Sequence, residues 1–543
     1  MTLTFKEAQK HFVQLRDKSI AELDSVFPPP KDSKHHEVPE KLPRNSVPVF
    51  QQMLAPSDAE IVNCDPIELL EKLAKAQISA VTVAGAFLRA AVIAQTLTNC
   101  LTELLPHEAL KTAQKLDEHL KTTGKTVGPL HGLPVSVKEM VGFKDRTCHF
   151  SVSSKIYNTT PDDAIILKIL YKAGANPFCR TTGPQFLMSL ESESPLHGKT
   201  YNPYNRDLTS GGSSSGEGAL VGIGASVLGL GTDIGGSIRG PAGCCGIYGL
   251  RPSVGRVSNT GCDYVMHGAE SIKACIGPLT SSPKLLDLFM KVMSDAEAWR
   301  YDPFTERTVW NPAEFAKKKL KVGYYVDDGY VTPHPPVIRA LNEFLDKIKS
   351  STFKDVEVEL VPFTPYDPER AITITRSLYF PDGGEELKKE LASVGEPLTE
   401  MSKMALFNPD VKHFSIEEMW KAHSQRDAFR WDLLQEWNKA GIDLLIAPTL
   451  PGAAFKFGTC NYWGYTAYWN LADYASVSMP FSAVKTSDKP VQDFKPRNKI
   501  DEEWQALYSP DVYEDAPLAV QLIAPRMRDE VVVEAMKMFS EME

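Results

Sequence analysis

The segment from Gly211 to Pro252 reads GGSSSGEGALVGIGASVLGLGTDIGGSIRGPAGCCGIYGLRP. It contains two blocks rich in glycine and serine, joined by a short apolar run. Glycine allows the backbone to adopt positive φ and to approach a ligand closely, at an entropic cost to folding. So many glycines and serines in one stretch predict a backbone shaped around a reactive site.

Strand-like and helical patterns alternate on both sides of this segment. Residues 133–140 (LPVSVKEM) and 176–182 (NPFCRTT) are short and apolar, as buried strands are, and 162–175 (DDAIILKILYKAGA) has helical periodicity between them. The same alternation continues downstream, for example at 319–326 (KLKVGYYV) and 442–450 (IDLLIAPTL). This order predicts an α/β fold with a large mixed β-sheet sandwiched between helices.

The domain organisation is predicted from the two ends of the chain. Residues 4–26 have the pattern of an amphipathic helix, and Thr4 and Glu7 have the spacing of a capping box. A proline-rich arm follows, so residues 1–58 are assigned to an N-terminal helix and arm. Residues 59–543 are predicted to form one domain, with a helical insertion around 285–440.

Charge and cysteine usage narrow the function classes. The 543 residues carry a net charge of -10, which argues against nucleic acid as a partner because phosphates favour a basic face. Nine cysteines without paired spacing favour reduced thiols and a cytoplasmic location. The N-terminus lacks an apolar leader, and the run 219–230 is too short and glycine-rich to span a bilayer, so no integral membrane segment is expected.

Cofactor and metal motifs fail on inspection. A dinucleotide fingerprint beginning at Gly229 requires glycine at position 234, where the chain has Ile234. A phosphate loop ending at Thr200 requires glycine at position 193, where the chain has Glu193. Residues 35–37 (HHE) are adjacent rather than one helical turn apart, so a solvated charge run is expected there. The prediction is no cofactor and no metal.

Nucleophilic catalysis is the chemistry that the remaining residues favour. A serine hydroxyl needs a base, and the histidines show no motif beside a G-x-S-x-G elbow, which is itself missing. Lys138 lies in the apolar strand-like segment PVSVKEM, where desolvation lowers a lysine pKa and makes the neutral amine available. Lys138 could instead extend to solvent from an edge strand.

The second glycine block provides a candidate nucleophile. The turn from Ile234 to Ser237 precedes a helix predicted to open at Ser237-Ile238, and the N–H groups at a helix start are unpaired and partly positive. Aimed at a tetrahedral oxyanion, such donors stabilise the transition state of acyl transfer. Ser237 would present its hydroxyl beside them; the alternative is that Ser213 and Ser237 are ordinary turn and N-cap residues.

These segments together resemble the amidase signature family of serine hydrolases. The resemblance rests on PVSVKE, GGSSSGEGAL and GTDIGGSIRGPAGCCGIYGLRPS, with Ser213 75 residues after Lys138 and Ser237 a further 24 residues on. Segments such as TTGPQFLMSLESESPLHGKTYNPYN and DLLIAPTLPGAA are also similar to fungal general amidases and fatty acid amide hydrolases. The similarity covers roughly residues 60–480, and it implies the fold of that family.

The resemblance assigns roles by motif position. It implies that Ser237 is the nucleophile, Ser213 the bridging serine and Lys138 the base, with a cis peptide bond between Gly212 and Ser213. It places the oxyanion hole at the backbone amides of Ile234, Gly235, Gly236 and Ser237. It implies that Ser214 holds the Lys138 ammonium, and that the loop is braced by Thr232, Asp233 and Arg239.

One position departs from the family pattern, and the substrate pocket is less well defined. The family usually has glycine where this chain has Ser215, and we expect Ser215 to cap the following helix rather than to narrow the loop. The residues expected to line the substrate pocket are Met140, Phe143, Leu187 and Met188. The segment 462–469 (YWGYTAYW) is assigned equally to the pocket or the core, and Cys244 and Cys245 to packing.

The predicted function is hydrolysis of a small-molecule carboxylic amide through an acyl-serine intermediate, with carbamates and esters as further candidate substrates. Two alternatives stay open: a glutaminase-type subunit of a tRNA-dependent amidotransferase, and a catalytically inactive binding protein of the same fold. Self-association into a homo-oligomer, the acyl-chain length and the natural substrate are left open by the sequence.

Overall fold

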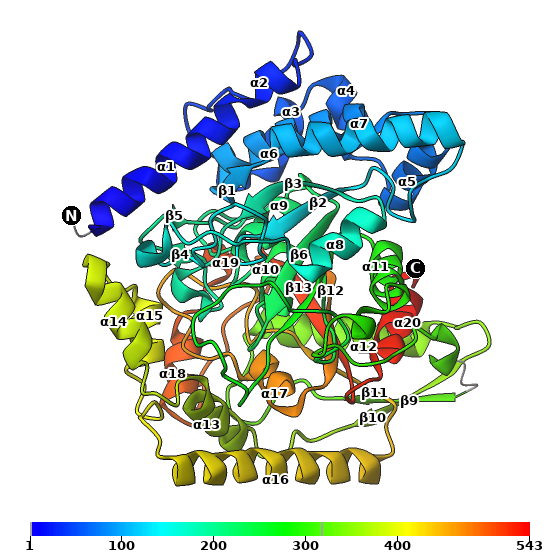
Figure 1. Ribbon diagram of the computed structural model, residues 1–543. Coiled ribbons are helices and arrows are strands. Elements are labelled where there is room, and N and C mark those ends of the chain that lie inside the picture. The colour runs from blue at the N-terminus through cyan, green and yellow to red at the C-terminus, as the bar shows by residue number, and fades with distance from the viewer. Residues whose placement is uncertain (1–2, 316–318, 543) are drawn as a thin grey trace.

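An 11-stranded sheet runs through the centre of the molecule in the computed structural model, which describes residues 3–315 and 319–542 (Figure 1). Two further strands, β4 and β5, form a separate antiparallel pair. The strands are β1 (Leu101–Leu104), β2 (Pro134–Lys138), β3 (Asn176–Thr181), β4 (Glu193–Ser194), β5 (Gly198–Lys199), β6 (Leu228–Asp233), β7 (Tyr248–Arg251), β8 (Cys275–Thr280), β9 (Lys319–Tyr324), β10 (Glu357–Pro362), β11 (Leu444–Pro448), β12 (Ala475–Ala483) and β13 (Pro517–Ala524).

The large sheet is mixed, as the sequence predicts. Its order is β1-β3-β2-β6-β8-β7-β12-β13-β11-β9-β10. β2 pairs in parallel with β3 and β6, and β9 pairs in parallel with β10 and β11, whereas β8, β7, β12 and β13 form antiparallel ladders in the middle. The predicted strands around residues 134, 176, 319 and 442 are all present.

Apolar residues cover both faces of the sheet. Successive side chains of a strand point to opposite faces, and in β11 Leu444 and Ile446 join one hydrophobic cluster while Leu445 and Ala447 join another. The first cluster includes residues of α6 (Ala80–Thr98), α11 (Pro283–Asp295), α12 (Pro335–Ser350) and α20 (Asp529–Ser540). The second includes residues of α13 (Pro368–Tyr379), α16 (Ile416–Ala440) and α17 (Gly464–Ala472). The sheet is therefore sandwiched between helices.

Twenty α-helices surround the sheet within the described ranges. They are α1 (Phe5–Ala21), α2 (Leu23–Val26), α3 (Val47–Met53), α4 (Pro56–Val62), α5 (Pro66–Ala74), α6 (Ala80–Thr98), α7 (Pro106–Thr123), α8 (Ile165–Lys172), α9 (Ser215–Gly222), α10 (Arg239–Cys245), α11 (Pro283–Asp295), α12 (Pro335–Ser350), α13 (Pro368–Tyr379), α14 (Glu385–Val394), α15 (Glu400–Leu406), α16 (Ile416–Ala440), α17 (Gly464–Ala472), α18 (Lys499–Ala506), α19 (Pro510–Tyr513) and α20 (Asp529–Ser540).

The N-terminal helix begins as the sequence predicts. Thr4 caps α1, and the Glu7 carboxylate accepts a hydrogen bond from the Thr4 backbone in return, which completes the capping box. The predicted single helix over 4–26 is split after Ala21 into α1 and the short α2. Figure 1 shows α1 and α2 lying along the outside of the molecule, beside α6 and α7.

One predicted segment differs from its description, and one helix is unusually apolar. The range 285–440 contains β9 and β10 of the large sheet as well as helices, so the purely helical part is α13–α16, which Figure 1 shows at the lower left and along the bottom. Helix α6 is long and apolar enough to cross a membrane by length and composition, but 78% of its most apolar window is buried inside the protein. Burial of this kind is usual for a core helix.

Candidate active site

Lys138 is the last residue of β2, and its amine is enclosed by hydroxyl groups. Its Nζ lies 2.8 Å from Ser213 Oγ, 2.8 Å from Thr232 Oγ1 and 3.3 Å from Ser214 Oγ. The side chain is 1% exposed, because β2 lies between β3 and β6 inside the sheet. Lys138 forms no ion pair with any residue in the described ranges. The edge-strand alternative is therefore wrong.

Burial changes the chemistry of this amine. Desolvation lowers the pKa of Lys138 to about 7, against an opposing effect of the negative charges of Asp233 and Glu217. Both acids are engaged elsewhere: Asp233 pairs with Arg239, and Glu217 accepts hydrogen bonds from Ser136 and Thr181. A substantial share of Lys138 is therefore neutral near neutral pH.

The first glycine–serine block holds the serine next to Lys138. The peptide bond between Gly212 and Ser213 is cis, as the family resemblance implies, and it precedes α9. Ser214 is the N-cap residue of α9, and its backbone N–H donates to the carbonyl of Ser237 at 3.1 Å. This hydrogen bond joins the two glycine-rich segments directly.

The capping role expected for Ser215 is wrong. Ser215 is the first residue of α9 rather than its N-cap, and its hydroxyl caps no backbone N–H. The Ser215 Oγ is buried and has no hydrogen-bond partner among the described residues. A serine here therefore buries a polar atom in the space that glycine would leave free.

The second glycine block is anchored by one buried acid. Asp233, at the end of β6, accepts hydrogen bonds from the backbone N–H groups of Gly236 (2.8 Å) and Ile238 (3.1 Å) and from the Arg239 guanidinium. Burial alone would raise the Asp233 pKa, but Arg239 and the Asn470 amide hold it well below its ordinary value. Asp233 is therefore a fixed anion that shapes the turn carrying Ser237, and α10 begins at Arg239, two residues later than predicted.

Three of the four predicted oxyanion-hole amides are free. Within residues 3–315 and 319–542, the N–H groups of Ile234, Gly235 and Ser237 have no hydrogen-bond partner, whereas that of Gly236 donates to Asp233. The carbonyl of Ile234 accepts from Tyr379 Oη at 2.9 Å, and in a trans peptide this turns the N–H of Gly235 the opposite way. The fourth amide, Gly236, supports the turn instead of facing a ligand.

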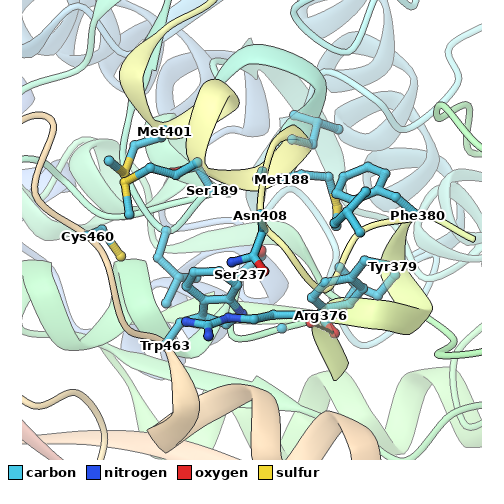
Figure 2. Close-up of a pocket in the computed structure, with 17 residues that line it drawn as sticks. Met188, Ser189, Ser237, Arg376, Tyr379, Phe380, Met401, Asn408, Cys460 and Trp463 are labelled. Atoms are coloured by element: carbon cyan, nitrogen blue, oxygen red, sulfur yellow. Dashed lines mark hydrogen bonds between the residues drawn. The ribbon is translucent and has the colours of Figure 1, made fainter. Parts of the chain in front are cut away.

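Ser237 opens onto an apolar cavity of about 650 Å³, counting the space open to solvent at its mouth. Figure 2 shows Ser237 among side chains from distant elements, including Met188, Met401 and Trp463. The Ser237 hydroxyl has no hydrogen-bond partner in the described part of the chain. The cavity is lined by Leu187, Met188, Ser189, Leu190, Ile234, Gly235, Ser237, Arg376, Tyr379, Phe380, Met401, Met404, Ala405, Asn408, Val411, Cys460 and Trp463.

Only half of the predicted pocket residues line this cavity. Leu187 and Met188 do, but Met140 does not; its sulfur accepts a hydrogen bond from Thr232 Oγ1 at 3.2 Å. Phe143 packs in the main hydrophobic cluster, with the Arg180 guanidinium 5.4 Å from its ring. Neither Met140 nor Phe143 is among the residues that line the cavity.

The aromatic segment 462–469 divides between the two roles left open for it. Trp463 lines the cavity, whereas Tyr462, Tyr465 and Trp469 are buried in the second hydrophobic cluster. Cys244 and Cys245 are buried packing residues, as expected.

Residues 35–37 of the N-terminal arm were expected to be a solvated charge run, but one of the two histidines is buried. His35 is 3% exposed, with its Nε2 2.8 Å from Asp24 Oδ1 and its Nδ1 2.7 Å from Ser33 Oγ. His36 also contacts Asp24, at 3.2 Å, but is half exposed. The buried His35 imidazole therefore holds the arm against α2 through Asp24. No local sequence motif indicates this contact.

The residues that sequence reasoning missed come mainly from other parts of the chain. Tyr379 and Thr466 hold the carbonyls of Ile234 and Gly235, at 2.9 and 2.7 Å, and Asn470 donates to Asp233. None of them lies in the three motifs. The only signal was the aromatic segment 462–469, which contains Thr466.

The amidase family model matches residues 82–533 of the chain. A putative amidase of Schizosaccharomyces pombe is 38% identical over 542 residues, covering 99% of both chains. The acetamidase of Emericella nidulans is 36% identical, covering 88% of this chain and 89% of its own. A solved fatty acid amide hydrolase superposes with a TM-score of 0.88 at 32% identity, covering 98% of this chain and 96% of that one.

Proposed function

The chain belongs to the amidase family, and from that premise we propose that it hydrolyses a carboxylic amide to an acid and an amine through an acyl-Ser237 intermediate. In this proposal Lys138 and Ser213 move the proton. The backbone amides beside Ser237 stabilise the oxyanion.

The observation that carries the proposal is the environment of Lys138. A lysine that served only the fold would pair with a carboxylate or reach solvent, since burying an unpaired ammonium is costly. Lys138 instead is 1% exposed and is surrounded by three hydroxyl groups, with burial lowering its pKa to about 7. This is the state required of a general base that works near neutral pH.

The hydrogen bonds around Lys138 favour one direction of proton transfer. The Thr232 hydroxyl donates to Met140 Sδ, and the Ser214 hydroxyl donates to the carbonyl of Thr232 at 3.4 Å. Both hydroxyls therefore accept the N–H bonds of a neutral amine. The lone pair of the amine is then left for the third hydroxyl, that of Ser213, at 2.8 Å.

The reaction proceeds in two halves. The Ser237 hydroxyl attacks the substrate carbonyl carbon while its proton passes to Ser213, and the proton of Ser213 passes to Lys138 Nζ. Collapse of the tetrahedral intermediate breaks the C–N bond, and the same relay returns a proton to the leaving nitrogen. Water then attacks the acyl-serine, the relay takes its proton and returns one to Ser237, and the acid leaves.

The oxyanion of each tetrahedral intermediate has three donors available. The free N–H groups of Ile234, Gly235 and Ser237 belong to a turn fixed by Asp233, Tyr379 and Thr466. Fixed donors need no reorganisation when charge develops, and each such donor contributes roughly 3 kcal/mol to transition-state stabilisation.

We expect small or medium amides as substrates. The mainly apolar lining of the cavity suits a compact, apolar acyl or amine group. Carbamates and esters pass through the same type of tetrahedral intermediate, so we include them as substrates that the same machinery would accept.

The test is labelling of the intact chain with a fluorophosphonate probe, followed by assay on short aliphatic amides, aryl amides, long acyl amides and carbamates. We expect the probe to modify Ser237 and amides to be turned over. Labelling without turnover of any amide, or no labelling at all, would contradict the proposal; the second result would favour an inactive binding protein.

A further inference from the structure

The cavity contains a cation that the hydrolytic machinery does not use. Arg376 lies on α13, three residues before Tyr379, and its side chain lines the same cavity as Ser237. The guanidinium carbon lies 5.2 Å from the centre of the Trp463 ring, and Figure 2 shows the Arg376 side chain extending along Trp463. The guanidinium is thus held at the wall of the cavity by an aromatic face.

The hydrogen-bonding groups of Arg376 are mostly unused. Its guanidinium offers five N–H donors, and the structure gives it one long hydrogen bond, from Nη2 to the carbonyl of Asn461 at 3.5 Å. The Nε atom is buried without a hydrogen-bond partner, and no carboxylate of the described residues forms an ion pair with Arg376. Burial lowers the Arg376 pKa, against a weaker opposing effect of the Asp410 charge.

Another arginine of the same helix shows what a structural role looks like. Arg370 lies at the other end of α13 and pairs with Asp432 at 3.2 Å. It also donates to the Tyr366 hydroxyl at 3.3 Å. Arg370 is absent from the cavity lining, so the two arginines share a helix but not an environment.

We propose that Arg376 binds a carboxylate group carried by the substrate, so that the preferred substrates are amides bearing a carboxylate in the part that lies in the cavity. The inference rests on the proposed amide hydrolysis. A planar guanidinium matches a carboxylate through two parallel hydrogen bonds, and the contact with the Trp463 ring holds the group at the cavity wall. Apolar side chains that line the same cavity, such as Met401 and Val411, lower its polarity and so strengthen the pairing.

Two substrate series locate the carboxylate. In the acyl series, monoamides of linear dicarboxylic acids are compared with amides in which an isopropyl group replaces the carboxylate. In the amine series, N-acetyl ω-amino acids are compared with the corresponding isopropyl compounds. The readout is the ratio of kcat/KM for each matched pair, which is independent of the fraction of active enzyme. The series with the larger ratio identifies the side of the scissile bond that faces Arg376.

The expected wild-type ratio favours the carboxylate by roughly tenfold or more in one series, the range for a charge-assisted hydrogen bond. Arg376→Met should abolish this preference, and Arg376→Lys should retain part of it, because a lysine keeps the charge but loses the paired geometry. Arg370→Met is the matched control and should leave the ratio unchanged. A wild-type preference for the isopropyl partner in both series would overturn the inference, as would a carboxylate preference that survives in Arg376→Met.

A binding measurement separates this inference from the hydrolytic proposal. Linear dicarboxylates added to the intact enzyme should raise its Tm in the wild type and in Arg370→Met, and not in Arg376→Met. Stabilisation through Arg376 without any amide turnover would leave the anion site standing and remove the hydrolytic function. Turnover of neutral amides with no dicarboxylate stabilisation and no carboxylate preference would remove the anion site and leave the hydrolytic function standing.

Discussion

In the proposed mechanism, the pH dependence of hydrolysis follows from the protonation state of Lys138. A protonated Lys138 cannot accept the proton of Ser213, so kcat/KM should rise with pH and level off above the pKa of this amine. Burial lowers that pKa from 10.5 to about 7. We therefore expect a midpoint near pH 7, with a tenfold fall in kcat/KM for each pH unit below it.

The magnitude of the effect follows from the same values. With a pKa of about 7, half of Lys138 is neutral at pH 7, whereas at a pKa of 10.5 about one molecule in 3,000 would be neutral. Lys138→Met removes the base but keeps an unbranched side chain of similar length. It should lower kcat/KM by roughly a hundredfold to ten-thousandfold, the usual contribution of a general base. It should also remove the rise of kcat/KM with pH.

A second buried group titrates in the same range and has to be separated from Lys138. Burial raises the pKa of Glu217 to about 7, although hydrogen bonds from Ser136 and Thr181 oppose the change. Glu217→Gln keeps the shape of this side chain but removes its titration. The rise of kcat/KM with pH should persist in Glu217→Gln. Its midpoint should lie at a slightly lower pH, because a negative charge near Lys138 is lost.

The assay is the pH profile of kcat/KM on a neutral amide, between about pH 5 and pH 10, for the wild type and both variants. Far-UV circular dichroism at each pH confirms that the fold is retained. A midpoint near 7 that survives in Lys138→Met would refute the assignment of Lys138 as base. If the rise of kcat/KM with pH is lost in Glu217→Gln but retained in Lys138→Met, the general base is Glu217.

Three further predictions concern the serines and the buried ion pair. Ser237→Ala should abolish both fluorophosphonate labelling and turnover while changing Tm little, since the Ser237 hydroxyl has no hydrogen-bond partner in the described ranges; wild-type turnover by this variant would end its assignment as nucleophile. Arg239→Met should lower the free energy of unfolding by roughly 3–5 kcal/mol, because it leaves the Asp233 charge buried and unpaired, and denaturant titration measures this. Ser215→Ala should raise the free energy of unfolding by roughly 1 kcal/mol, because it removes a buried hydroxyl without a partner; a clear loss of stability in the same titration would contradict this.

The parts of the fold that could be predicted are those with a strong local pattern. The apolar runs that became β2, β3, β9 and β11 are short and bounded by turn residues, and they were placed within two or three residues. The order of the strands was not predictable, because pairing such as that of β7 with β12 joins residues more than 200 positions apart. Local propensity contains no information about that pairing.

Ser215 and Phe143 show where reasoning from sequence failed at the site itself. A serine before a helix usually caps it, but the chain enters α9 one residue earlier, and Ser214 occupies the N-cap position. Phe143 is close to Lys138 in sequence, yet the turn after β2 directs it into the main hydrophobic cluster. Proximity along the chain predicts proximity to the catalytic group only while the backbone keeps its direction.

The sequence by itself determined the chemistry that depends on short stretches of backbone. An amine in an apolar strand and a serine in a glycine-rich turn are local features, since burial of a strand and the freedom of glycine act over a few residues. Only the tertiary structure decided which side chains line the cavity and how burial lowers the pKa of Lys138. The cavity wall comes from α13, α15 and Trp463, more than 130 residues beyond Ser237. Contacts over such separations arise from packing of the whole chain, which is why Arg376 could be proposed as a ligand-binding residue only from the folded molecule.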